Sequence, residues 1–157
     1  MKTLVLGLGN PILSDDAAGI KVAREVAKQL NSPKVTVAET SEAGFSLLDS
    51  IGGYDKVIII DAIQTKNGNA GQVYRMETED FSFAKHLYSP HQINLATSLE
   101  LGKMLNLAMP QEITIFAVEA KDITSFNEKC TPEVEKAIPE VVKMVLQELH
   151  AKHSPEG

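Results

Sequence analysis

Short apolar runs rich in β-branched residues recur along this chain and predict five β-strands. The clearest is the uninterrupted Val-Ile-Ile-Ile run at 57–60, which is typical of a central strand buried on both faces. The other runs are more mixed, and they cover 3–6, 35–38, 72–76 and 113–118. Turn-forming residues follow the first run, where Gly7-Leu8-Gly9-Asn10-Pro11 predicts a tight loop.

Stretches with apolar residues at helical spacing separate most of these strands. The first predicted helix follows the opening loop and has its apolar stripe at Ile20, Ala23, Ala27 and Leu30. Similar patterns predict helices over 45–51, 90–105 and 131–149. Strands that alternate with helices favour an α/β fold. We therefore expect a three-layer sandwich with a five-stranded, mostly parallel sheet and helices on both faces. It would form one domain over 1–150, followed by a frayed tail at 151–157.

Composition narrows the class of protein. A chain of 157 residues with 43% hydrophobic residues is long enough to bury one core. The net charge of -6 and the lack of a basic stretch argue against a nucleic-acid partner. Cys130 is the single cysteine, so an internal disulfide is impossible and a reducing compartment is expected. The sequence has no apolar run of about 20 residues and no signal-peptide pattern. We expect a cytoplasmic monomer that does not bind membranes.

Three side chains stand out at the edge where ligands bind in open α/β sheets, beyond the carboxyl ends of the strands. Asp16 follows the first loop, and Asp61 terminates the central apolar run. His91 lies in Ser89-Pro90-His91-Gln92, a helix-start signature with a capping-box partner. A helix N-terminus disfavours imidazolium, so His91 should stay neutral and able to coordinate a metal. Two carboxylates and one imidazole suit zinc, nickel or a similar divalent cation better than calcium.

Simpler interpretations of these and neighbouring residues remain open. Asp15 is better explained as a first-turn acid of a helix, and Asp16 could be one too. Asp61 could be a turn acid, and His91 taken alone could be an exposed first-turn residue. We expect Glu119 to be solvated and Cys130 to be structural, and His86, His150 and His153 to lie on the surface. The Gly7-Leu8-Gly9 pair does not indicate a dinucleotide site, because Ile12 stands where the third glycine would be.

Taken in order, three motifs make the chain resemble the hydrogenase maturation endopeptidases over nearly its whole length. They are Gly7-Leu8-Gly9-Asn10 with Asp15-Asp16 and Gly19, then Ile60-Asp61-Ala62, then Ser89-Pro90-His91-Gln92. The resemblance implies an enzyme that removes a short C-terminal extension from the large-subunit precursor of a [NiFe] hydrogenase after nickel insertion. The protein partner would be that precursor.

The same resemblance implies roles for the three residues. Asp16, Asp61 and His91 fall where the family has its metal-binding triad, and we expect them to be both the catalytic and the metal-binding residues. The nickel would be supplied by the client protein, and zinc or cadmium could substitute for it in vitro. Either Asp16 or Asp61 could act as the base that activates water.

Two other classes of protein compete with this interpretation. The opening Val5-Leu6-Gly7-Leu8-Gly9-Asn10-Pro11 also resembles the peptidyl-tRNA hydrolases, but their Thr-Arg-His-Asn segment is absent and the chain is acidic. A non-catalytic protein that binds the immature subunit as a nickel checkpoint is the other alternative.

Overall fold

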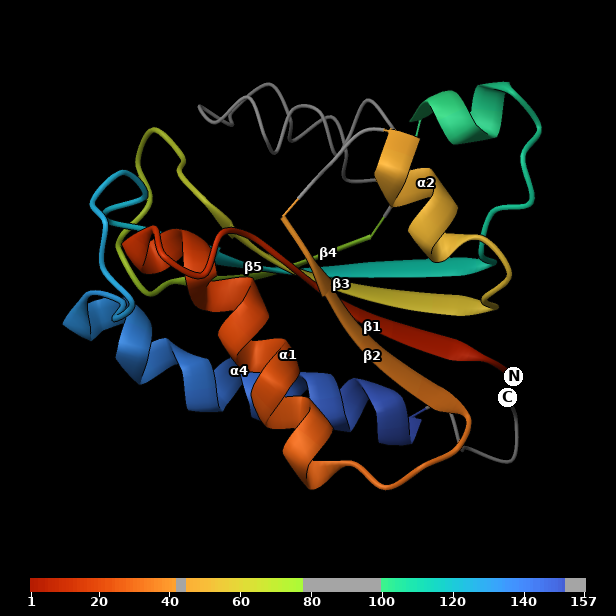
Figure 1. Ribbon diagram of the computed structural model, residues 1–157, viewed down its shortest axis with the longest axis horizontal. Coiled ribbons are helices and arrows are strands. Elements are labelled where there is room, and N and C mark those ends of the chain that lie inside the picture. Colours follow the sequence, from red (N-terminus) through yellow and green to blue (C-terminus); the bar gives the residue numbers. More distant parts are fainter. Residues whose placement is uncertain (42–44, 78–99, 152–157) are drawn as a thin grey trace.

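A computed structural model describes residues 1–41, 45–77 and 100–151, and the statements below concern these residues (Figure 1). The strands are β1 (Thr3–Leu8), β2 (Val35–Thr40), β3 (Lys56–Ile63), β4 (Val73–Glu77) and β5 (Glu112–Glu119). A short 3-10 helix, η1 (Ser14–Ala17), leads into α1 (Ala18–Gln29). The other helices are α2 (Phe45–Ile51) and α4 (Pro132–Ala151), and residues 100–104 are also helical.

The strands form one five-stranded sheet in the order β2-β1-β3-β5-β4. The neighbours β2, β1, β3 and β5 are parallel, and β4 pairs antiparallel with β5 at the edge. The predicted mostly parallel sheet is therefore confirmed. All residues of β3 are buried, as its unbroken apolar run indicates for a central strand.

Helices cover both faces of this sheet, as predicted. On one face, α1 and α4 cover Val5, Ile58 and Phe116 of the strands. Val22 of α1 and Val141 of α4 belong to the same hydrophobic cluster. On the opposite face, α2 lies over the sheet (Figure 1), and the core there includes Leu6, Leu47, Ile51, Ile59 and Ile115. Because side chains alternate along a strand, each β3 residue belongs to one of these two layers.

An ion-pair cluster fixes α4 to the edge of the sheet where β3 begins. Lys56 is fully buried, and its Nζ lies 2.5 Å from a carboxylate oxygen of Glu148 and 3.5 Å from one of Glu112. Arg75 of β4 pairs with the other oxygen of Glu148 at 2.9 Å. Burial favours the neutral form of Glu148, but the hydrogen bonds from Lys56 and Arg75 outweigh it, and its pKa is lowered. Within the described residues, no helix is both long and apolar enough to cross a membrane.

Candidate active site

The loop after β1 is folded tightly against η1 at the carboxyl edge of the sheet. Gly9 has φ of 142°, and a Cβ there would overlap the backbone oxygen of Asp16. Gly19 approaches the sheet just as closely, since a Cβ on it would overlap the carbonyl oxygens of Leu8 and Ile60. Only glycine permits both the positive φ and these approaches. The two glycines therefore bring the segment that carries Asp16 against the ends of β1 and β3.

Asp16 is held in one orientation by the loop that precedes it. Its side chain is half-buried, and Oδ2 accepts a hydrogen bond of 2.8 Å from the backbone N–H of Asn10. The Asn10 side chain in turn accepts a hydrogen bond of 3.1 Å from the N–H of Ile12. The carboxylate of Asp16 is thus positioned by backbone groups rather than left as a mobile first-turn acid.

Asp61 lies near the end of β3, level with the end of β1, because its neighbour Ile60 pairs with Gly7. It is fully buried, and its Oδ1 accepts a hydrogen bond of 2.8 Å from the N–H of Ala62. It shares a strand face with Ile59, which packs in the core beneath α2. A buried carboxylate at this edge, one strand from the Asp16 loop, is the arrangement expected of a reactive site.

His91, the third predicted ligand, falls in 78–99 and so lies outside the described residues. Among the residues that are described, no group of three His, Cys, Asp or Glu side chains could hold a metal ion. The expected set includes His91, so the convergence of Asp16, Asp61 and His91 stays a prediction. His86 and His153 also lie outside the described part, whereas His150 is exposed as predicted.

Asp15 differs from its expected role as a simple helix-end acid. It does lie in the first turn of η1, but it is fully buried and its carboxylate bonds to a distant loop. The backbone N–H groups of Lys121 and Asp122 donate to its Oδ2 at 2.9 and 3.0 Å, and that of Thr131 donates to Oδ1 at 2.7 Å. Asp15 therefore fixes η1, and with it Asp16, to the segment between β5 and α4.

Comparisons with known proteins show which family the chain belongs to. The hydrogenase maturation protease family model matches residues 20–148. The chain belongs to the hydrogenase maturation protease family. It is 29% identical over 151 residues to the hydrogenase 2 maturation protease of Escherichia coli K12, covering 95% of this chain and 91% of that one. It is 24% identical over 153 residues to the hydrogenase expression/formation protein HupD of Rhizobium leguminosarum bv. viciae, covering 96% and 75%.

Solved structures of the family have the same fold. The E. coli hydrogenase maturating endopeptidase HybD superposes with a TM-score of 0.86 at 28% identity, covering 98% of this chain and 94% of that one. The [NiFe] hydrogenase maturation protease HybD of Thermococcus kodakarensis gives 0.74 at 27% identity, covering 94% and 98%. The predicted family and enzyme class are thereby confirmed, and this maturation protease is a peptidase.

Glu119 departs from the expectation of a solvated acid. Its exposed fraction is 2%, and its carboxylate accepts hydrogen bonds from the N–H and the hydroxyl of Thr65 and from the hydroxyl of Tyr74, at 2.7 to 2.9 Å. Burial, followed by the nearby Glu119 carboxylate, raises the pKa of Tyr74. Glu119 therefore anchors the loop after β3 to the end of β5. The sequence carries no signal for this, because its partners lie 45 and 54 residues away.

Cys130 is structural, as predicted. It is buried, and its thiol donates to the carbonyl oxygen of Ser14 over 3.6 Å. Burial raises the pKa of the thiol to about 11, so the reactive thiolate is scarce at neutral pH.

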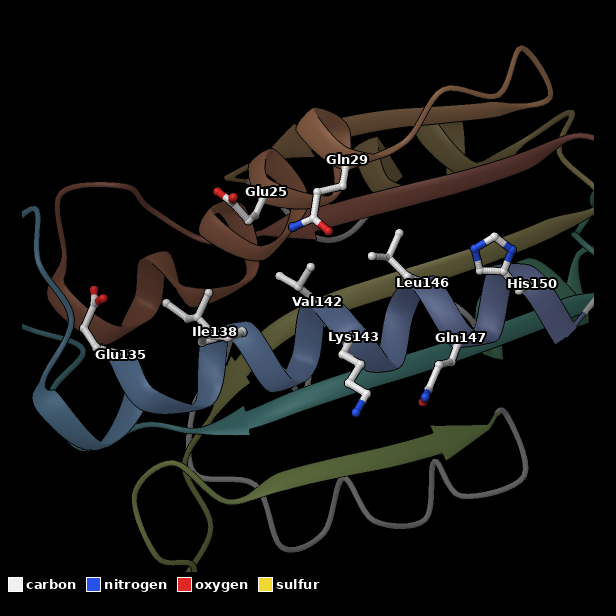
Figure 2. A pocket seen from close by; sticks show the side chains of 10 residues that line it. Glu25, Gln29, Glu135, Ile138, Val142, Lys143, Leu146, Gln147 and His150 are labelled. Carbon is white, nitrogen blue, oxygen red and sulfur yellow. The ribbon is translucent and has the colours of Figure 1, made fainter.

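A groove of about 650 Å³ lies between α1 and α4 (Figure 2). These helices cover the face of the sheet opposite to the one that Asp61 shares with Ile59. Ile138, Val142 and Leu146 point from α4 toward α1, and Glu25 and Gln29 line the α1 side. Neither predicted carboxylate lines this groove, so it is separate from the candidate active site.

Proposed function

We propose that this protease removes the C-terminal extension of a [NiFe] hydrogenase large-subunit precursor after nickel insertion, and that Asp16, Asp61 and His91 engage the nickel of that client. The observation that carries the proposal is the pair of carboxylates at neighbouring strand ends. Asp61 is buried at the end of β3, and Gly19 packs the segment carrying Asp16 against the same point. Family membership supports the peptide substrate.

The donor set fits a borderline divalent cation. Asp16 and Asp61 supply carboxylate oxygens and His91 supplies an imidazole nitrogen, a mixture that suits nickel, zinc or cadmium. With a neutral imidazole the three groups carry a formal charge of -2, which balances one such ion. Nickel here is part of the substrate, and it anchors the client at the three side chains.

The chain's own carboxylates then supply the acid–base chemistry of peptide hydrolysis. Asp16 or Asp61 accepts a proton from the attacking water, whose oxygen bonds to the scissile carbonyl carbon. As the C–N bond breaks, that proton passes to the leaving amine. Asn10 and Ala62 hold the two carboxylates through backbone N–H groups, so each base keeps its orientation before the client arrives.

Isosteric substitution of each carboxylate tests these roles. Asp61→Asn and Asp16→Asn keep an oxygen that can accept the bond from Ala62 or Asn10, so the fold should survive. We expect the rate of precursor cleavage to fall by about a hundredfold or more in the variant that loses the base. The matched control is Asp49→Asn, an exposed aspartate on α2 that should cleave normally. Normal cleavage by both site variants would overturn the assignment.

The dependence on nickel is tested on the client rather than on the protease. We expect nickel-loaded precursor to be cleaved and metal-free precursor to stay intact, because Asp16, Asp61 and His91 would have no nickel ion to bind. Cleavage monitored by gel shift under both conditions decides this. Equal rates for the two precursors would contradict recognition through nickel.

A further inference from the structure

Two large apolar side chains are exposed on adjoining loops at the carboxyl edge of the sheet. The exposed fraction of Phe126 is 84% and that of Ile12 is 47%. The carbonyl oxygen of Ile12 accepts a hydrogen bond of 2.9 Å from the N–H of Asn127, and Leu13 forms a parallel bridge with Asn127. The loop after β1 and the loop after β5 are therefore paired where these two residues lie.

Both loops are held in place by buried or backbone hydrogen bonds. Asp15 binds the start and end of the second loop, and the N–H of Ser14 donates to the carbonyl oxygen of Asn127 at 2.9 Å. Asp122 Oδ1 accepts bonds of 3.0 Å from the N–H groups of Thr124 and Ser125, just before Phe126. An aromatic side chain presented by a fixed loop loses little conformational freedom on binding, so it is suited to act as an anchor.

The two residues are continuous with the candidate active site. Ile12 is four residues before Asp16, and it is linked to it through Asn10, which accepts from the Ile12 N–H and donates to the Asp16 carboxylate. The other exposed large apolar residues among those described are Met1, which precedes β1, and Met104, Leu105 and Leu107, which precede β5. All four therefore lie toward the opposite edge of the sheet. Ile12 and Phe126 therefore lie at a different edge of the sheet from the other exposed apolar residues.

We infer that Ile12 and Phe126 form a docking platform for an apolar segment of the hydrogenase large-subunit precursor, next to the bond that is cut. This inference rests on the proposed function. A protease that acts on one site of a protein client needs contacts that hold the client beside the carboxylates. The surface that two side chains can bury is far smaller than the roughly 800 Å² that each partner buries in a stable protein dimer. Ile12 and Phe126 suit anchoring of a segment of the client better than self-association.

The test compares Phe126→Ser and Ile12→Ser with Met104→Ser, whose side chain is 78% exposed at the other edge. We expect KM for the nickel-loaded precursor to rise by about tenfold in the first two variants, as for an interface anchor, with kcat little changed. Tm should not move, since these side chains are exposed. Met104→Ser should match the wild type, and Phe126→Leu should recover part of the lost affinity.

Measuring binding alongside cleavage distinguishes a failure of the proposed function from a failure of the docking platform. If the wild type leaves the precursor uncut, the proposed function fails, and the Kd for the precursor still tests the platform. If the wild type cuts and Phe126→Ser and Ile12→Ser show unchanged KM and Kd, the platform is wrong and the proposed function stands. A self-association measured by sedimentation that Phe126→Ser abolishes, with KM unchanged, would also overturn the inference.

Discussion

Asp15 and Asp16 are neighbours in η1, yet their carboxylates accept hydrogen bonds from different parts of the chain. Asp15 is fully buried, and it bonds to the backbone of the loop between β5 and α4. Asp16 is half-buried, and a hydrogen bond from the backbone N–H of Asn10 orients it at the carboxyl edge. Asp15 thus holds the loop in place, whereas Asp16 is the one of the two that we propose to act on the client.

Asp15→Ala should therefore lower stability. It leaves the N–H groups of Lys121, Asp122 and Thr131 without their charged acceptor, and we expect the free energy of unfolding to fall by about 3 kcal/mol. Urea denaturation followed by circular dichroism measures this. Asp49→Ala, on the exposed surface of α2, is the control and should change stability little. A loss no larger than the control's would show that Asp15 does not tie the loops together.

Cys130 gives a second prediction at this scale. Because burial raises the pKa of its thiol to about 11, we expect iodoacetamide to alkylate the folded protein very slowly at pH 8. The unfolded chain, with an ordinary thiol pKa, should react at the rate of a free cysteine. Mass spectrometry over time in buffer and in denaturant compares the two, and equally fast labelling in buffer would contradict a buried thiol.

Elements were predicted well where the residues themselves carry the signal. The Val-Ile-Ile-Ile run identified β3 as the central strand, and helical spacing identified α1, α2 and α4. The direction of β4 was not predictable, because a short strand has the same pattern whether it runs parallel or antiparallel. The burial of Asp15 and Glu119 was missed for another reason. Their partners lie 45 to 116 residues away, and no local pattern encodes such contacts.

The contact between α4 and the sheet yields a prediction about charge. Glu148→Gln weakens the pairing of the fully buried Lys56 ammonium, and we expect a loss of about 3 kcal/mol in the free energy of unfolding. Glu135→Gln, whose side chain is 48% exposed in its pair with Lys21, is the matched control on the same helix. If the free energy of unfolding fell equally little in both variants, the buried cluster would not be stabilising α4.

The same cluster predicts how stability depends on pH. The pKa of Glu148 in the folded protein is lowered below its usual 4.5, so its contribution is present above that value. It is lost as the pH falls through the folded pKa, where the carboxylate takes up a proton. We expect Glu148→Gln to show a shallower fall in Tm below about pH 4.5 than the wild type. Parallel curves for the two proteins would contradict this assignment.

Across the whole molecule, the two edges of the sheet serve different purposes. The edge where β3 begins holds the Lys56, Glu112, Arg75 and Glu148 cluster, which stabilises the packing of α4. The edge where β1 and β3 end carries Asp16, Asp61 and the exposed Ile12 and Phe126. Substitutions at the first edge should therefore reduce stability, and conservative ones at the second should reduce cleavage.

The most direct test is the intact mass of a nickel-loaded hydrogenase large-subunit precursor before and after incubation with the purified protein. We predict the loss of one C-terminal segment, with the rest of the client unchanged and no loss when the Asp16→Asn, Asp61→Asn double variant is added instead. A precursor that keeps its full mass with the wild type, or loses the segment equally with the double variant, would contradict the account.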